Sequence, residues 1–447
     1  MTQLASKSNK LLPEFTRLAI ANIISNLMVP LAGIVDTAFL GHLADIHHLA
    51  GVALATVIFN VIYWSFGFLR MGTTGMAAQA IGRNDETELW LIALRNSLIG
   101  LGFGLLLLLV QWPIRELGFT LLSAPAAVQQ AGRAFFDGRI WGAPAVLINY
   151  VLLGWFLGRA LGTRVIVLSV IGNGANVVLD YLFIVKWGWA ATGSGAATAA
   201  SQYLMLIVGL TWVGYELIRR RLLSQLRSLL PRLGDLAALK ALFQLNRDIL
   251  IRTFALVISF GVFIQLSASL GTQILAANTL LLQVFTLAAY FIDGIAFATE
   301  SFAGEAHGRD DRVQLRYLLK LAGITSIVLG IAFALVFVLF PRSLLGLMTD
   351  HQSVLDQSSQ YVLWLLPVLG FGGLAFMLDG YFLGLTAGHA LRNSTVFAAV
   401  VGFLPTAIAA WHWQQAHLLW LALTLFMIFR AGSLGVLVRE VLGEVRR

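Results

Sequence analysis

The sequence predicts an all-α integral membrane protein with twelve transmembrane helices in two pseudo-symmetric six-helix lobes. Three observations support this fold class. Hydrophobic residues make up 58% of the 447-residue chain and charged residues only 12%, with a mean hydropathy of +0.82. Apolar runs of about twenty residues, the length that crosses a bilayer, recur along the chain. Motifs of the first half also return in the second half.

Each predicted span is a continuous apolar run, unlike the alternating pattern of about ten residues that is typical of a membrane β-barrel strand. The spans expected in the first half are 15–40, 48–70, 88–112, 134–158, 163–186 and 190–215. Those expected in the second half are 247–270, 276–302, 313–340, 357–384, 391–411 and 416–438.

An internal repeat relates the two halves. AAQAIGRNDETEL from Ala77 resembles AGEAHGRDDRVQL from Ala303, 226 residues later, and GWFLG from Gly154 has the same offset to GYFLG from Gly380. An even number of spans per half gives both halves the same orientation, as in transporters with parallel repeats around a central cavity. We expect an N-terminal lobe at 1–215, a linker at 216–246 and a C-terminal lobe at 247–447.

The linker contains RRRLLSQLRSLLPRL, which favours either a basic amphipathic helix on the membrane surface or a solvated connection. Basic residues gather in this linker and in alternate connections, so the positive-inside rule predicts cytoplasmic termini in a cell (inner or plasma) membrane.

Charge and composition also limit the partners. The net charge of +8 lies on membrane loops rather than on a soluble face, so we expect the lipid bilayer and no nucleic acid as partner. The absence of cysteine excludes disulfides, thiolate metal sites and thiol catalysis. We expect no cofactor, no bound metal and a monomer.

Asp36 lies inside an apolar span, where carboxylates are costly and usually functional. On a helical wheel Asn26, Pro30 and Asp36 share one face. Pro30 cannot donate a hydrogen bond to the carbonyl of Asn26, which predicts a helix break beside this face.

A second polar face follows the span at 163–186. Asn173, Asn176 and Asp180 recur at helical spacing, and both aspartates lie one to two turns from the outer ends of their spans. The two carboxyl groups could therefore share one pocket. The competing interpretation is that each aspartate only accepts hydrogen bonds from nearby asparagine or threonine and stiffens the bundle.

Four motifs carry a family resemblance: VPLAGIVDTAFLGHL, AAQAIGR, IGNGANVVLDY and LDGYFLG. Together they resemble the multidrug and toxic compound extrusion (MATE) family, in its DinF-like branch. The resemblance implies a two-lobed antiporter that expels organic cations and amphiphilic drugs in exchange for protons or sodium ions. Many relatives carry proline near the start of the first span, where this chain has Ala21.

The resemblance also implies site residues. Asp36 and Asp180 match the acidic pair of the family's N-terminal lobe. The substrate-binding residues expected from the polar faces and from the resemblance are Asn26, Asn149, Tyr150, Asn173, Asn176 and Thr198.

Proton coupling is the favoured mechanism. Desolvation and mutual repulsion both favour the protonated form of a carboxyl pair, and protonation turns an acceptor into a donor. The same oxygens could bind Na⁺, but sodium-coupled relatives typically have a glutamate in their seventh span, and RTFALVISFGVFIQLSASLG of this chain contains no acid.

The second half carries its own acids. Arg70 aligns under the repeat one turn from Asp293, which predicts that these two residues form an inner gate between the lobes; independent partners for each are the alternative. The roles of Asp293, Glu300 and Asp379 stay open.

We therefore expect secondary active multidrug efflux by alternating access, driven by protons through Asp36 and Asp180. The alternatives are a sodium-coupled drug antiporter and a flippase for lipid-linked saccharides, which should have a cationic cavity. An integral-membrane enzyme is disfavoured because no nucleophile–base set or HExxH motif occurs, and a channel because no filter-like repeat occurs. The natural substrate cannot be read from the sequence.

Overall fold

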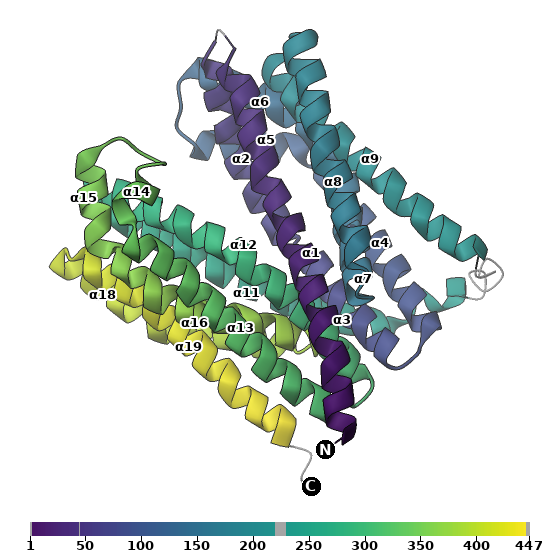
Figure 1. Ribbon diagram of the computed structural model, residues 1–447. Helices are drawn as coiled ribbons and strands as arrows, with labels where there is room; N and C mark the ends of the chain where they lie inside the picture. Colours follow the sequence, from purple (N-terminus) through teal and green to yellow (C-terminus); the bar gives the residue numbers. More distant parts are fainter. Residues whose placement is uncertain (1, 44, 220–228, 444–447) are drawn as a thin grey trace. The chain divides into compact units, whose positions relative to one another are not determined.

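Helices form nearly all of the described chain, which comprises residues 2–43, 45–219 and 229–443 of the computed structural model (Figure 1). Within those residues, twelve helical segments are long and apolar enough to cross a membrane. The predicted fold class and the predicted number of spans are therefore confirmed.

The chain divides into two compact units. We call them the N-terminal unit (Ile24–Leu242) and the C-terminal unit (Met1–Ile23 with Phe243–Arg447). The first part of α1 thus groups with the second half of the sequence, whereas the sequence analysis assigns 1–215 to one lobe. The functional lobes stay a prediction, and residues 220–228 of the predicted linker lie outside the described residues.

The described helices follow one another in this order. The first half contains α1 (Thr2–Gly41), α2 (His47–Ser65), α3 (Phe68–Gly82), α4 (Glu86–Leu109), α5 (Gln111–Leu121), α6 (Ala126–Arg139), η1 (Ile140–Gly142), α7 (Ala143–Gly158), α8 (Gly162–Asp180), η2 (Tyr181–Lys186), α9 (Ala190–Arg219) and η3 (Leu230–Arg232). The second half contains α11 (Leu236–Ser269), α12 (Thr272–Gly308), α13 (Arg312–Leu339), α14 (Pro341–Leu345), α15 (Gln352–Tyr361), η4 (Val362–Trp364), α16 (Leu365–Gly384), α17 (Gly388–Phe397), η5 (Ala398–Phe403), α18 (Leu404–Trp413) and α19 (Ala416–Gly443).

Several spans are longer than predicted and change helical type on the way. The span predicted at 48–70 consists of α2 and α3 and continues to Gly82, because its last turns are made of small residues that pack inside the unit. The 3-10 turn η1 precedes Pro144 in the fourth span, and η4 precedes Pro367 in the tenth. Since proline donates no N–H, the helix before it cannot continue its normal hydrogen bonding there.

The repeat seen in the sequence returns in the backbone. Asn84 and Asp310, 226 residues apart, both adopt a left-handed conformation, with φ of 55° and 54°. The next residue in each case, Asp85 or Asp311, caps the following helix by accepting a hydrogen bond from a backbone N–H three residues on. Asparagine and aspartate tolerate the left-handed region and cap helices well, so the shared motif encodes a shared turn.

The GWFLG and GYFLG motifs mark a second shared feature. A Cβ at Gly154 would overlap the carbonyl oxygen of Arg70 in α3, and a Cβ at Gly380 would overlap that of Ala296 in α12. Only glycine permits these close helix contacts, which explains why the motif occurs in both halves.

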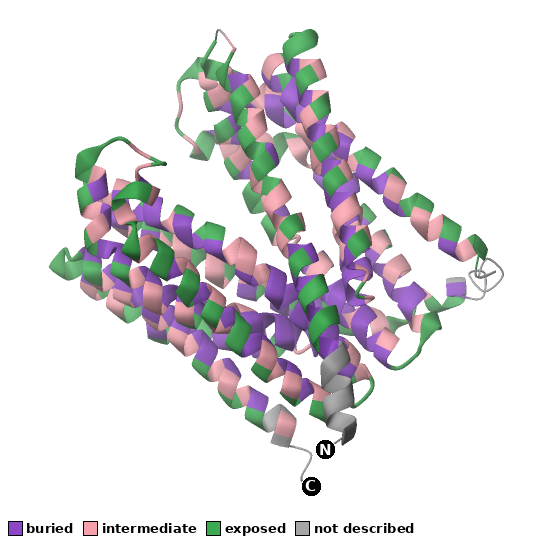
Figure 2. Cartoon of the chain, in the orientation of Figure 1, coloured by how far each residue is buried: buried purple, intermediate pink, exposed green. Residues whose placement is uncertain are grey.

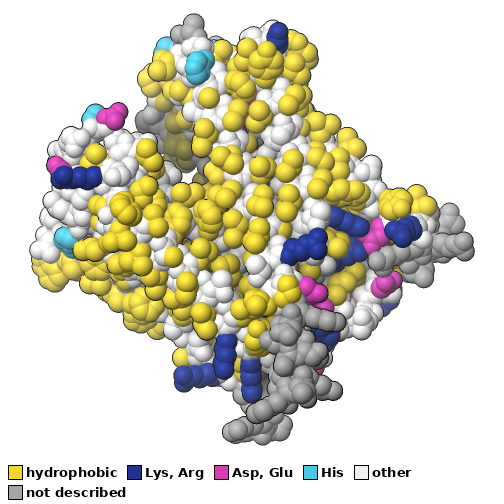
Figure 3. Space-filling model, viewed as in Figure 1, with side chains coloured by type: hydrophobic (Ala, Val, Ile, Leu, Met, Phe, Trp, Pro, Cys, Tyr) yellow, Lys and Arg dark blue, Asp and Glu magenta, His cyan; other side chains and the backbone are white. Residues whose placement is uncertain are grey.

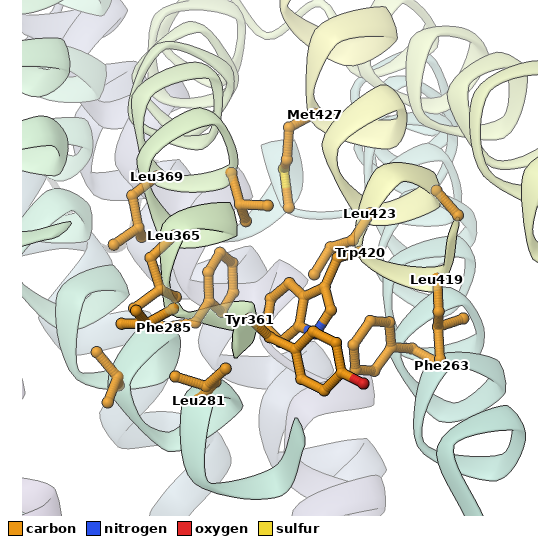
Figure 4. Close-up of a cluster of buried hydrophobic side chains, with 14 of the residues drawn as sticks. Phe263, Leu281, Phe285, Tyr361, Leu365, Leu369, Leu419, Trp420, Leu423 and Met427 are labelled. Atoms are coloured by element: carbon orange, nitrogen blue, oxygen red, sulfur yellow. The ribbon is translucent and has the colours of Figure 1, made fainter. Parts of the chain in front are cut away.

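The C-terminal unit has a large apolar core (Figure 4). Trp420 stacks edge-on against Phe263 at 5.1 Å between ring centroids, and both side chains are fully buried. The indole N–H of Trp420 donates to Asn278 at 2.9 Å, so the ring's polar group is also satisfied.

The surface of the protein is largely apolar. Figure 2 shows exposed residues along many helices, and Figure 3 shows mostly hydrophobic side chains on the visible face, as expected for a surface that meets lipid.

Candidate functional site

Asp36 and Asp180 meet inside the N-terminal unit. Asp36 is on α1 and is partly buried, whereas Asp180 is the last residue of α8 and is fully buried. Their side chains lie within hydrogen-bonding contact of each other. The sequence-based expectation that the two carboxyl groups share one place in the fold therefore agrees with this geometry.

The hydrogen bonding of the pair requires a proton. Oδ2 of Asp180 accepts from Nδ2 of Asn176 at 2.9 Å. In the described part of the chain, Oδ1 of Asp36 and Oδ1 of Asp180 meet no donor. Ionised carboxylates carry acceptors only, so a proton on one of the two converts their contact into a hydrogen bond.

Asn176 and Thr198 complete the local network. The amide of Asn176 also faces Oγ1 of Thr198 on α9, at 3.4 Å. Thr198 in turn donates to the carbonyl oxygen of Ser194, at 3.0 Å. Oδ2 of Asp180 is therefore held by Asn176 of its own helix, and Thr198 of α9 contacts the same amide group.

The backbone changes immediately after Asp180. Residues Tyr181–Lys186 form the π-helical segment η2, with wider turns than an α-helix. Such segments often occur at functional sites, because they reorient one turn of side chains without ending the helix. The sequence contains no simple signal that predicts this change of helical type.

Asn173 and Asn149, two other predicted substrate-binding residues, bond to backbone carbonyl groups. Nδ2 of Asn173 donates to the carbonyl of Ser169 in its own helix, at 2.8 Å, and Nδ2 of Asn149 donates to the carbonyl of Gln202, at 2.9 Å. Tyr150 interacts electrostatically with two arginines, Arg70 and Arg139. Asn26 is half-buried on α1. The structure therefore joins Asn176 and Thr198 to the acid pair by hydrogen bonds, and the binding roles of all these residues stay predictions.

Pro30 lies within α1, which continues as a helix from Thr2 to Gly41. Near it, the hydroxyl groups of Ser25 and Ser169 form a hydrogen bond that ties α1 to α8. A helix break at Pro30 is therefore not part of this conformation, and a rearrangement at Pro30 stays a prediction.

Arg139 is a further charged residue near Asp36, and it is not among the site residues predicted from the sequence. Its guanidinium interacts electrostatically with Asp36 and stacks over the ring of Phe59, 4.6 Å from the ring centroid. The signal was present, because Arg139 falls inside the span predicted at 134–158, where a cation is as unusual as a carboxylate.

The C-terminal unit contains a different acidic centre. Asp379 is buried, and its Oδ2 accepts from guanidinium groups of both Arg252 and Arg430. Asp293 belongs to this unit, whereas Arg70 belongs to the N-terminal unit, so their pairing as an inner gate stays a prediction.

The fold and this site define a class: a polytopic helical membrane transporter with an ionisable pair inside one half. The MatE family model matches residues 21–182 and 249–408, and the chain belongs to that family.

Individual relatives agree with this assignment. The chain is 36% identical over 425 residues to DNA damage-inducible protein F of Escherichia coli K12, covering 95% of this chain and 91% of that protein. It is 22% identical over 431 residues to the probable multidrug resistance protein NorM of Thermotoga maritima, covering 94% and 90%.

A solved structure shows the same fold. It is the outward-facing conformation of a multidrug resistance MATE family transporter, which superposes with a TM-score of 0.85 at 19% identity, covering 97% of this chain and 96% of that one.

Proposed function

We propose that this protein exports organic cations and amphiphilic drugs by secondary active antiport with protons, with Asp36 and Asp180 as the coupling acids. The observation that carries the proposal is the contact between these two carboxyl groups inside the N-terminal unit. The names of the relative from Thermotoga maritima and of the solved transporter both refer to multidrug resistance, which supports a drug as the exported substrate.

The acid pair suits exchange because either a proton or a cationic drug can neutralise its negative charge. Two ionised carboxylates in a desolvated site repel each other, and either a proton or an organic cation relieves that repulsion. Binding of one therefore weakens binding of the other. Such competition is what antiport requires, since each ligand must leave before its counterpart crosses.

Asn176 and Thr198 supply a donor and an acceptor beside Asp180, in both its ionised and its protonated form. The amide donates to Asp180 when that carboxylate is ionised, and the hydroxyl oxygen of Thr198 offers an acceptor.

The lipid bilayer, and for a bacterial chain the inner membrane, is the expected location, with both termini on the cytoplasmic side.

The test is ethidium transport by the full-length protein in proteoliposomes, with an imposed pH gradient or an imposed sodium gradient. We expect the pH gradient alone to drive transport by the wild type. Asp36→Asn should lower the proton-driven rate to background, because an amide cannot carry the proton. Asp45→Asn is the matched control, since Asp45 is exposed in the loop after α1 and should leave transport unchanged.

Two outcomes would contradict the proposal. Transport driven by sodium but not by protons would assign the same oxygens to Na⁺. Normal proton-driven transport by Asp36→Asn, at normal expression, would remove the carboxyl pair from coupling.

A further inference from the structure

Arg139 is the cation that the proton-coupling scheme leaves without a role. It ends α6 and lies near the middle of the 33-residue span Ala126–Gly158, so its charge is at membrane depth. Ionisable groups at that depth usually serve a ligand, an ion or another charge.

Aromatic rings hold the guanidinium in place. It lies 4.6 Å from the ring centroid of Phe59, 5.6 Å from that of Tyr63 and 5.6 Å from that of Phe135. Phe59 and Phe135 are themselves buried, so the arrangement is set by the packing of α2 against α6. Ring faces stabilise the positive charge, but they do not satisfy the five N–H donors of a guanidinium.

Oxygen atoms lie near the guanidinium but do not bond to it. Tyr63, Tyr150 and Asp36 all interact with Arg139 electrostatically, yet within the described residues Arg139 forms neither a hydrogen bond nor an ion pair within 4 Å. Other arginines inside the two units differ. Arg159 pairs with Glu216, and Arg252 and Arg430 pair with Asp379.

We propose that Arg139 binds the anionic group of a zwitterionic amphiphile whose cationic group is held at Asp36 and Asp180. The cationic end of this scheme rests on the proposed function. A guanidinium binds a carboxylate or sulfonate through paired hydrogen bonds, and such bonds are strong where water is scarce. Substrates with an amine and an acid group are therefore the class that uses both charges of the site.

The separation of the charges supports this arrangement. A direct ion pair between Asp36 and Arg139 would cancel both charges and leave nothing for a ligand to recognise. Their electrostatic interaction without contact keeps a negative and a positive centre in one unit. A purely structural role at the C-terminal end of α6 would stabilise the helix but would not distinguish one ligand from another.

The test uses two dyes that differ in a single group. Tetramethylrhodamine is a zwitterion with a free carboxylate, and its methyl ester is a cation with the same ring system. Binding to the purified full-length protein is measured by fluorescence anisotropy at constant pH and salt. We expect the wild type to bind the zwitterion more tightly than the ester.

Arg139→Gln should remove this preference. Loss of one charge-assisted contact should weaken zwitterion binding by about tenfold, equivalent to about 1.4 kcal/mol. Binding of the ester should stay within about twofold or become tighter, because a repelling cation is gone. Arg139→Lys keeps the charge without the planar fork and should give an intermediate preference.

Arg133→Gln is the matched control. Arg133 lies on the same helix, pairs with Glu116 and stacks on Phe119, and the substitution should change neither dye's affinity. Equal weakening of both dyes by Arg139→Gln would mean a structural role, and unchanged binding of both would place Arg139 outside the site. A wild type that prefers the ester would also overturn the proposal, even if the glutamine variant did not fold. None of these readouts needs an ion gradient, so a failure of proton coupling would be recognised separately.

Discussion

Each of the two units contains a buried aspartate, but the side chains that surround the aspartate differ in charge. In the N-terminal unit Asp180 contacts another acid, Asp36, and accepts one hydrogen bond from Asn176. In the C-terminal unit Asp379 contacts two guanidinium groups, from Arg252 and Arg430. The first arrangement leaves negative charge to be neutralised by a ligand or a proton, whereas the second neutralises it within the protein.

We infer from this difference that Asp36 and Asp180 are coupling acids and that Asp379 is a structural one. A carboxylate held by two arginines has fixed partners, and its removal would leave two buried cations without compensation. A carboxyl pair without a bound cation changes its interactions whenever a proton arrives or leaves. Because Asp180 and Asp379 are both buried, our proposal rests on the identity of their neighbours rather than on burial.

The largest expected effect on stability follows from Asp379→Asn. This change should destabilise the folded protein by about 3–5 kcal/mol, because Arg252 and Arg430 lose their shared counter-ion. Thermal unfolding of the purified protein in detergent measures the loss. Asp36→Asn should leave the melting temperature unchanged or raise it, since it removes repulsion between acids.

The exposed pair Arg342 and Asp356 provides a control for that comparison. Asp356→Asn should change stability by less than about 1 kcal/mol, because exposed ion pairs contribute little. Equal melting temperatures for Asp379→Asn and the wild type would show that the arginine pair does not depend on Asp379.

A smaller effect is expected at Pro30. Pro30→Ala would supply a backbone N–H for the carbonyl of Asn26 and stiffen α1 beside the acid pair. Transport should become slower while equilibrium drug binding is retained, as measured by ethidium flux and fluorescence titration on the same preparation. Unchanged turnover would show that α1 need not rearrange at this residue.

The smallest effect is expected at Thr198. Thr198→Val keeps the shape of the side chain but removes the hydroxyl that faces Asn176 at 3.4 Å. That long contact should contribute little, so transport should fall by no more than about fivefold, the equivalent of about 1 kcal/mol. A complete loss would mean that Thr198 binds the proton or the drug directly.

Much of the fold could be predicted from the sequence, because membrane spans are read from continuous apolar length. The repeat was also readable, since Asn84 and Asp310 occupy the same turn in both halves. Helical periodicity and depth in the membrane indicated that Asp36 and Asp180 could share one pocket, with independent structural roles as the alternative. Each of these features depends on local pattern.

Side-chain contacts that depend on which of several nearby groups a residue meets could not be predicted from the sequence. Asn173 bonds to its own helix although it shares a face with Asn176, because a short polar side chain can turn to the nearest carbonyl. Arg252 and Arg430 are far apart in the chain and meet only through packing around Asp379. Arg139 lay within a predicted span, yet its aromatic neighbours come partly from a different helix.

The central claim is that the acid pair of the N-terminal unit exchanges a proton for a drug, and proton release on drug binding tests it most directly. Purified wild-type protein in weakly buffered detergent solution should release protons when ethidium binds, as reported by a pH-indicator dye. Asp36→Asn should bind without release, while Asp45→Asn should release protons as the wild type does. Undiminished release from Asp36→Asn would contradict the account.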